Sequence, residues 1–328
     1  MANKYIFNSP FKSDIQKFLD LKHSLGYKYA LEEILLSQFD KMCIFKYPKE
    51  KVLTRIIAMD WATARKNESN SSLGNRIVTI REFAKYLNNT GKYAFVIPTT
   101  YIPKKKKYQS YIYTNFELKK IFDVIDNKKF NCRYKNCYIA YPVLFRILYC
   151  CGLRISEALH LKVKDVDLQN GIIYVYESKN NTDRLVPISE ELKNICTEYF
   201  NKLHLSSDKN DFFFFTKDSQ TQIGQSAIHT SFRKILALAG IEKSKLNNPR
   251  IHDFRHTFAI NCLKKFISEN KDLNAYLPIL KTYMGHSKFK STEYYLKLTN
   301  DMFPDILLRF NSYIEDAIPD IGGECYEK

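Results

Sequence analysis

Hydrophobic residues recur three or four positions apart through residues 11–90, the spacing that places them on one face of an α-helix. The apolar positions of three such runs are Ile15, Phe18 and Leu19, then Ile56, Ile57, Trp61 and Ala64, then those within residues 77–87. Ser13 and Asp14 are a candidate N-cap for the first run, and the polar residues 88–91 end the last one. The pattern predicts a helical N-terminal domain over residues 1–97.

A second domain is predicted over residues 111–300, again largely from helical periodicity. Residues 118–125 and 141–151 carry apolar positions at helical spacing, and Gly152 then acts as a stop signal. Most of the remaining sequence up to residue 300 also favours helix.

One hairpin interrupts these helices. Residues 171–176 are β-branched and aromatic, residues 179–183 are turn formers, and residues 184–188 are a second short strand. Pro187 suits an edge strand, because proline cannot donate a hydrogen bond to a neighbour. The predicted fold class is therefore mainly α with a small antiparallel β-sheet (α+β).

A basic linker is expected over residues 98–110. Pro98 and Pro103 disfavour helix there, and four adjacent positive charges follow, namely Lys104, Lys105, Lys106 and Lys107. A run of lysines is commonly just a solvated surface. Between two domains of a basic protein, these four are well placed to cross a phosphate backbone, so they are candidate DNA-binding residues.

An acidic segment closes the chain at residues 301–328. Residues 296–328 contain 7 Asp and Glu against 3 Lys and Arg, and apolar residues recur at helical spacing after Pro304. An amphipathic helix is predicted, which either folds back on its own domain or docks on a neighbouring protomer. Its charge, opposite to that of the rest of the chain, favours the neighbouring protomer.

The charge balance indicates what kind of partner the protein binds. The 328 residues include 51 Lys and Arg against 35 Asp and Glu, a formal net charge of +16, and residues 1–107 hold 20 of the basic residues against 9 acidic ones. Such a surplus points to a polyanion, either nucleic acid or an anionic membrane face. No apolar run approaches the roughly 20 residues of a membrane span, and the N-terminus has no apolar signal-peptide core. We expect a protein of the bacterial cytosol, with its eight scattered cysteines reduced.

Four separated segments carry residues suited to chemistry on a phosphate. They are Gly-Leu-Arg-Ile-Ser-Glu at 152–157, the hairpin with Lys179 and Arg184, His-Asp-Phe-Arg-His at 252–256, and Met-Gly-His-Ser at 284–287 with Tyr295 beyond it. Each motif alone is weak evidence, but the ordered set is specific.

In order and local context this set resembles the tyrosine recombinase (phage integrase) family, and within it the transposon-type integrases. The resemblance is close over residues 154–300, and the N-terminal helices are compatible with the core-DNA-binding domain of that family. It implies a site-specific DNA recombinase that integrates or excises a mobile element through a 3′-phosphotyrosine intermediate. It also implies double-stranded DNA target sites, a homo-tetramer on two of them that is a monomer or weak oligomer when free, and no cofactor.

The residue types fit phosphodiester chemistry. Two guanidinium groups, those of Arg154 and Arg255, are suited to neutralising the charge that builds on the non-bridging oxygens. His252 lies three positions before Arg255, so on a helix both face one phosphate, with His252 as a donor or proton-transfer group. His286 would donate to the same oxygens. Taken alone, Arg154 would more often be a structural partner of Glu157.

The resemblance also assigns the nucleophile and the general acid. Its spacing from His286 selects Tyr295 as the nucleophile over Tyr294, which is expected to face the core. Lys179 in the hairpin is suited to protonating the departing 5′-oxygen, because its ammonium is a mobile proton donor.

A zinc site is rejected. His252 and His256 have the i, i+4 spacing of a zinc-binding helix, but Asp253 stands where the catalytic glutamate should be, and no third ligand is evident. We expect no metal, and His256 is interpreted as a structural histidine that bonds nearby backbone.

Two alternatives to a recombinase stay open at this point. A type IB topoisomerase uses similar chemistry on one duplex, and a DNA-binding protein that has lost catalysis would serve as a regulatory partner. The complete set of candidate residues argues against the second.

Overall fold

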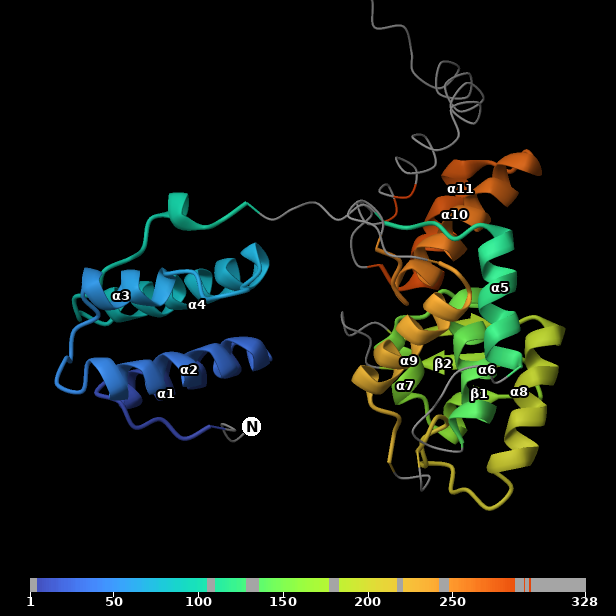
Figure 1. The fold of residues 1–328 in the computed structure, drawn as a ribbon, viewed down its shortest axis with the longest axis horizontal. Coiled ribbons are helices and arrows are strands. Elements are labelled where there is room, and N and C mark those ends of the chain that lie inside the picture. The colour runs from blue at the N-terminus through green and yellow to red at the C-terminus, as the bar shows by residue number, and fades with distance from the viewer. Residues whose placement is uncertain are drawn as a thin grey trace, which may run out of the picture. The chain divides into compact units, whose positions relative to one another are not determined.

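The computed structural model describes residues 5–104, 110–127, 136–176, 183–216, 221–241, 248–286, 292 and 295. The chain divides into two compact units, residues 1–108 and residues 109–328 (Figure 1). Each unit has a hydrophobic core of its own, and the second unit has a further small cluster around Tyr295.

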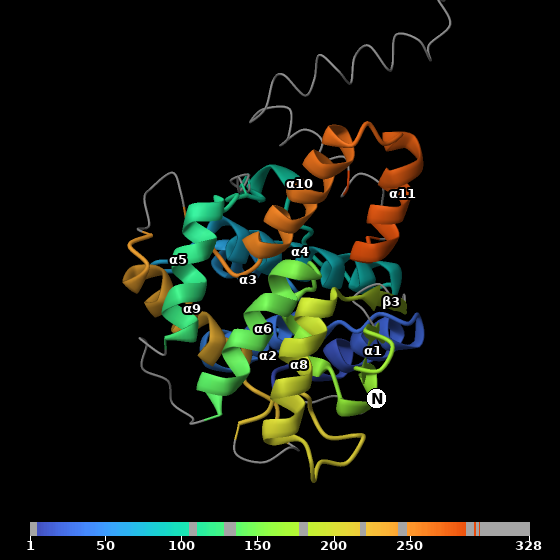
Figure 2. The same cartoon turned by 90° about the vertical axis from the view of Figure 1, so that its right-hand side faces the viewer.

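The second unit is mainly helical. Its described helices are α5 (Asn115–Asp126), α6 (Cys137–Cys150), α7 (Ile155–His160), α8 (Glu190–Leu203), α9 (Gln225–Leu238), α10 (Asp253–Ser268) and α11 (Leu273–Met284), with a short 3-10 turn at Val163–Asp165. The apolar helix α6 packs against α5, α8 and α10, so it forms the centre of the unit (Figure 2). The helices predicted over residues 118–125 and 141–151 are thus confirmed, and Gly152 follows α6 with a φ of 58°.

The predicted hairpin is also confirmed, with one strand added. The antiparallel sheet has the order β1 (Val166–Asp167), β2 (Ile172–Val175), β3 (Arg184–Pro187), and Val175 pairs with Arg184. Pro187 lies on the edge strand β3, as expected. The sequence did not reveal β1, which is only two residues long. Phe213 and Phe214 are fully buried in the core of this unit.

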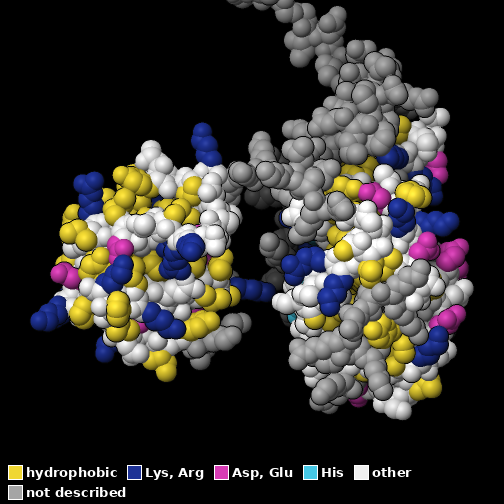
Figure 3. Space-filling view, in the orientation of Figure 1, with side chains coloured by type: hydrophobic (Ala, Val, Ile, Leu, Met, Phe, Trp, Pro, Cys, Tyr) yellow, Lys and Arg dark blue, Asp and Glu magenta, His cyan; other side chains and the backbone are white. Residues whose placement is uncertain are grey.

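The first unit packs four described helices around one core: α1 (Lys12–Ser24), α2 (Ala30–Lys46), α3 (Arg55–Ala62) and α4 (Asn70–Asn89). Phe39 and Trp61 meet edge to face at its centre, with their ring centroids 5.4 Å apart. On the face seen in Figure 3, Lys and Arg side chains are scattered over this unit and Asp and Glu side chains are few. The helical prediction for residues 11–90 is therefore confirmed.

Three local expectations in this unit are wrong. The helix α1 begins before Ser13 and Asp14, and its N-cap Phe11 has no side-chain cap hydrogen bond. Ile56 is 72% exposed, because α3 turns Ile57 inward instead. Ala64 lies beyond α3, which ends at Ala62. Adjacent apolar residues leave the face of a short helix ambiguous, and only packing resolves it.

The first part of the predicted linker belongs to the first unit. Residues Thr99–Tyr101 form a 3-10 turn where extended chain was expected, and Ile102 packs against the core. A Cβ atom on Gly74 of α4 would lie 3.7 Å from Ile102 Cγ2, an ordinary van der Waals distance, so this part of the chain lies close against α4. Lys104 is described here, whereas Lys105, Lys106 and Lys107 lie outside the described residues. The predicted helix over residues 301–328 also lies outside them.

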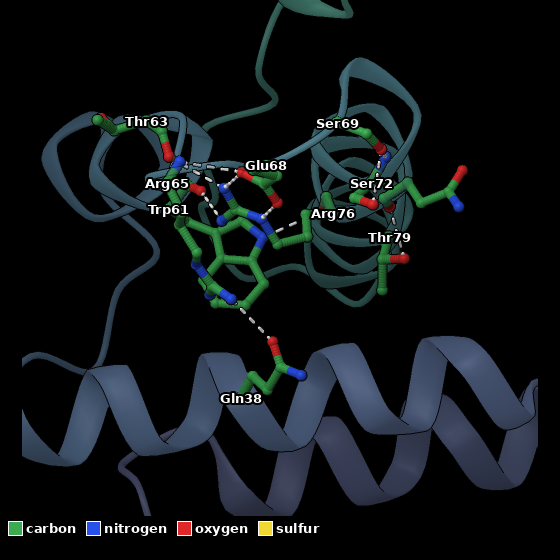
Figure 4. A network of polar contacts seen from close by, with 10 residues as sticks. Gln38, Trp61, Thr63, Arg65, Glu68, Ser69, Ser72, Arg76 and Thr79 are labelled. Carbon is green, nitrogen blue, oxygen red and sulfur yellow. Dashed lines mark hydrogen bonds and ion pairs between the residues drawn. The ribbon is translucent and has the colours of Figure 1, made fainter. Parts of the chain in front are cut away.

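A buried ion pair ties the connection between α3 and α4 to the helices (Figure 4). Arg76 is 2% exposed, and its Nε and Nη2 donate to the two carboxylate oxygens of Glu68, each at 2.7 Å. The same guanidinium donates to the carbonyl oxygens of Trp61 and Thr63, and Trp61 Nε1 donates to the carbonyl of Arg76 at 3.1 Å. The hydrogen bond from Arg76 lowers the pKa of Glu68.

Replacing Arg76 should destabilise the first unit strongly. Arg76→Ala leaves the Glu68 carboxylate, whose side chain is 8% exposed, without its guanidinium partner, and removing one partner of a buried pair costs about 3 to 5 kcal/mol. Lys85→Ala is the matched control, since its pair with Glu82 is exposed and should change the free energy of unfolding by less than about 1 kcal/mol. Urea unfolding of both variants measures the two values. Equal losses would contradict the importance of the buried pair.

Candidate active site

Three arginines donate to three consecutive carbonyl groups at the C-terminal end of α11. Arg184 Nε donates to the Tyr283 carbonyl at 2.8 Å, Arg255 Nη2 donates to that of Met284, and Arg154 Nη2 donates to that of Gly285 at 3.0 Å. The last carbonyl groups of a helix have no partner within it, and they carry the negative end of the helix dipole. The end of α11 is therefore an acceptor site for guanidinium groups.

Gly285 makes this arrangement possible. It ends α11 with a φ of 63°, the left-handed conformation that favours glycine at a helix end. A Cβ atom there would also lie 2.8 Å from Arg184 Nη1, which leaves no room for a side chain. The Met-Gly-His motif thus requires glycine at its second position for a structural reason. His286 follows directly after the helix end that the three arginines contact.

Glu157 holds two of the three guanidinium groups. Its Oε1 accepts from Arg154 Nη1 at 2.6 Å and from Arg184 Nη1 at 3.2 Å. Its Oε2 accepts from the Arg154 backbone nitrogen at 2.9 Å and from Arg184 Nη2 at 2.8 Å. Burial by itself would raise the pKa of Glu157, but the hydrogen bonds and charges of Arg184 and Arg154 lower it to about 2. The carboxylate is thus charged at any physiological pH.

Arg184 is the residue of this cluster whose contacts were not anticipated. The side chains of β3 alternate so that Arg184 and Val186 point inward while Leu185 is 56% exposed. A usable signal was present, because alternation puts Arg184 on the same face as Val186. The sequence analysis named Arg184 only as part of the hairpin motif and predicted no contact for its side chain.

Arg255 is fixed more rigidly than Arg154. It lies on α10, is 2% exposed, and its Nη1 donates to the Gly152 carbonyl at 2.5 Å. Burial lowers its pKa to about 10, so the guanidinium remains charged at neutral pH. The side chain of Arg154 is 18% exposed. The two arginines predicted to bind a phosphate are therefore brought together, one enclosed and one partly open to solvent.

Three histidines surround these arginines in their neutral form. Desolvation, followed by the charges of nearby arginines, lowers the pKa of His252 to about 4 and that of His286 to about 3. His256 is similarly lowered to about 3, first by desolvation and then by His252 and Arg255. His252 is the N-cap of α10, and its ring lies 4.8 Å from that of His256. His286 Nδ1 lies 3.0 Å from Thr292 Oγ1.

Tyr295 lies between two of these histidines. It is 2% exposed, its ring centroid is 5.8 Å from that of His286, and its hydroxyl is 3.2 Å from His256 Nδ1. His256 was interpreted as a structural histidine that bonds nearby backbone, and its Nδ1 lies within hydrogen-bond distance of a side chain 39 positions away. Tyr294 and Lys179 lie outside the described residues.

The described residues contain no cluster of three His, Cys, Asp or Glu side chains that could hold a metal ion. They also form no helix long and apolar enough to span a membrane. The charged groups that the described part of the site offers to a ligand are therefore guanidinium groups. An arrangement of fixed arginines beside neutral imidazoles and a phenol is suited to binding and cleaving a phosphodiester.

Comparisons with known proteins give the same picture. Residues 112–302 match the model of the phage integrase family. The protein y4rB of Sinorhizobium fredii (strain NBRC 101917 / NGR234), an integrase/recombinase by its name, is 25% identical over 315 residues, which cover 94% of this chain and 99% of y4rB. Tyrosine recombinase XerH of Campylobacter jejuni is 30% identical over 191 residues, 56% of this chain and 48% of XerH.

Solved structures share the fold. The Tn1549 transposon integrase in complex with transposon right end DNA superposes with a TM-score of 0.61 at 16% sequence identity, covering 86% of this chain and 94% of that one. A crystal structure of XerH bound to difH substrate, a pre-cleavage complex, gives a TM-score of 0.60 at 20% identity, covering 82% of this chain and 75% of XerH. The predicted fold class is thus confirmed.

The pairing of Glu157 with two arginines should make stability depend on pH. Because its pKa is lower in the folded protein, the carboxylate stabilises the fold above its ordinary pKa of 4.5, and this contribution is lost as the pH falls through about 2. Glu157→Gln should reduce the free energy of unfolding by about 3 kcal/mol near neutral pH, and less as the pH falls. Denaturant unfolding of both proteins from pH 7 to pH 2 measures this. A constant difference across that range would contradict the assignment.

Proposed function

The chain belongs to the phage integrase family and is a site-specific DNA recombinase, and from this premise we propose that Tyr295 is its nucleophile and that Arg154, Arg255, His252, His286 and Lys179 assist the reaction. The observation that carries the proposal is the gathering of the two arginines and His286 around the end of α11, with the Tyr295 ring stacked beside His286.

Arg154 and Arg255 would bind the scissile phosphate. Guanidinium groups offer planar pairs of donors to phosphate oxygens and stabilise the charge that builds on them in the transition state. Backbone carbonyl groups and Glu157 already hold both side chains in place, so little reorganisation is needed when DNA arrives. Such preorganisation is what makes electrostatic stabilisation effective.

The strand transfer then needs one attack and one proton donor. Tyr295 Oη forms a bond to phosphorus as the bond from phosphorus to the 5′-oxygen breaks, which leaves a 3′-phosphotyrosine and a free 5′-hydroxyl. The phenol proton passes to a neutral imidazole of the site, and Lys179 delivers a proton to the departing 5′-oxygen. Attack by the 5′-hydroxyl of another strand on the phosphotyrosine reverses the step and rejoins the DNA.

The neutral histidines fit this chemistry. In the free protein, charged His252 and His286 would be repelled by the guanidinium groups, and their lowered pKa values reflect this after desolvation. A neutral imidazole still donates one N–H to a phosphate oxygen. A bound phosphodiester also adds negative charge next to the rings, which raises their pKa values and favours the protonated, donating form.

Double-stranded DNA would be held by both units. The first unit and the linker carry 20 basic residues against 9 acidic ones within residues 1–107, including the candidate contacts Lys104, Lys105, Lys106 and Lys107. Charge of this kind binds the phosphate backbone and makes affinity fall with salt concentration. Two similar folds, the Tn1549 integrase and XerH, were solved with DNA, which supports the same partner for this chain.

Exchange of two duplexes would require four copies of the chain. Each protomer supplies one tyrosine and cuts one strand, so two double-stranded sites need a homo-tetramer. The acidic residues 301–328 are the proposed link between protomers, because their charge complements the basic remainder of the chain. The likeness to a transposon integrase favours a mobile element as the DNA that is integrated or excised, within the bacterial cytosol.

Tyr295→Phe should abolish the covalent protein–DNA adduct, because phenylalanine has no oxygen to attack phosphorus. The substrate is a nicked duplex selected from a random-sequence pool by covalent capture on the wild-type protein, and the adduct is read on denaturing gels. Tyr294→Phe is the matched control and should still form the adduct. An adduct in the Tyr295 variant would remove this residue as the nucleophile.

Lys179→Ala should cleave the same duplex poorly but recover when sulfur replaces the 5′-bridging oxygen at the cut site. A thiolate departs without being protonated, so the general acid becomes unnecessary. Arg154→Ala should not recover, since its role is to bind the phosphate oxygens. Equal rescue of both variants, or of neither, would count against Lys179 as the acid.

A further inference from the structure

Tyr295 has a hydrogen-bonding partner that the proposed set of catalytic residues does not include. Its hydroxyl lies 3.2 Å from His256 Nδ1, and the two ring centroids are 5.5 Å apart. His256 follows directly after Arg255 on α10, so the helix that fixes the phosphate-binding guanidinium also fixes this ring. One helix thus positions both a phosphate ligand and a partner of the nucleophile.

The chemistry of the pair gives the hydrogen bond a direction. A phenol is a good donor, and a neutral imidazole with its proton on Nε2 offers Nδ1 as an acceptor. His256 is held neutral because its surroundings oppose an added proton: burial comes first, followed by electrostatic interactions with His252, Arg255, Arg250 and His286. The neutral ring can therefore accept a hydrogen bond from the phenol.

The position of Tyr295 explains why a partner matters. The phenol is 2% exposed, with the ring of His286 stacked on it at 5.8 Å. Stacking and apolar packing restrain the plane of the ring, but they do not restrain the direction of the O–H bond or the lone pairs of Oη. In-line attack on phosphorus requires those lone pairs to point at the phosphate, and displacement by about 1 Å can cost about 100-fold in rate.

We propose that His256 is a positioning residue for Tyr295. Its Nδ1 accepts a hydrogen bond from the phenol and so directs the Oη lone pairs toward the phosphate bound by Arg154 and Arg255. This rests on the proposed role of Tyr295 as the nucleophile. In this proposal, the second histidine of the His-Asp-Phe-Arg-His segment bonds the nucleophile, and the first, His252, contacts the phosphate.

Two substitutions at His256 separate the hydrogen bond from the packing. His256→Asn retains an acceptor, because the amide oxygen stands two bonds from Cβ, at the place of Nδ1. His256→Leu fills similar space without any acceptor. His229→Leu on α9 is the matched control for the loss of an imidazole, since the ring of His229 contacts Gln225 and lies outside the site.

The measurement is the rate of adduct formation on the captured nicked duplex at saturating protein, together with the half-saturating concentration and the thermal unfolding midpoint. His256→Leu should be slower by about 10- to 100-fold at saturation, with the half-saturating concentration unchanged within about 2-fold. His256→Asn should recover about 10-fold of that loss. His229→Leu should react like the wild type.

Three results would overturn the proposal: wild-type rates in the Leu variant, equal loss in the Asn and Leu variants, or a loss explained by weaker DNA binding or a lower unfolding midpoint. Tyr295→Phe in the same assay keeps the two proposals apart. If that variant still forms an adduct, the nucleophile is wrong. If it forms none and the Leu variant reacts normally, the nucleophile stands and the role of His256 falls.

Discussion

The candidate site depends on one interaction, the convergence of three guanidinium groups on the C-terminal end of α11. Like charges repel at such short range, and the arrangement is stable because each group donates to a carbonyl oxygen of residues 283–285 at the negative end of a helix. Glu157 supplies the remaining compensation by accepting from both Arg154 and Arg184. Removing either the helix end or the carboxylate would leave part of this positive charge uncompensated.

This arrangement divides the arginines by function. Each of the three side-chain nitrogen atoms of Arg184 donates to a protein group. Arg154 retains 18% exposure and therefore keeps donors for a ligand. Arg184 thus anchors the carboxylate that also holds Arg154.

The electrostatics of the site also explain why imidazole and phenol accompany the guanidinium groups. A further permanent cation here would add to the repulsion, whereas histidine can remain neutral in the free protein and gain charge when a phosphate arrives. In the proposed reaction, Tyr295 is neutral before attack and becomes part of a phosphodiester afterwards. Among the described residues of the site, the helix end and Glu157 compensate the positive charge of the guanidinium groups.

The sequence by itself determined the helices, the hairpin and the ordered set of candidate residues, because periodicity, turn chemistry and motif order are local properties. Tertiary structure alone decided that Arg184 turns inward to Glu157 and that His256 reaches Tyr295 across 39 positions. It also decided that residues 283–285 accept hydrogen bonds from guanidinium groups through their backbone carbonyl groups. Every residue has such a carbonyl, so the sequence carries no sign of which ones will accept a guanidinium.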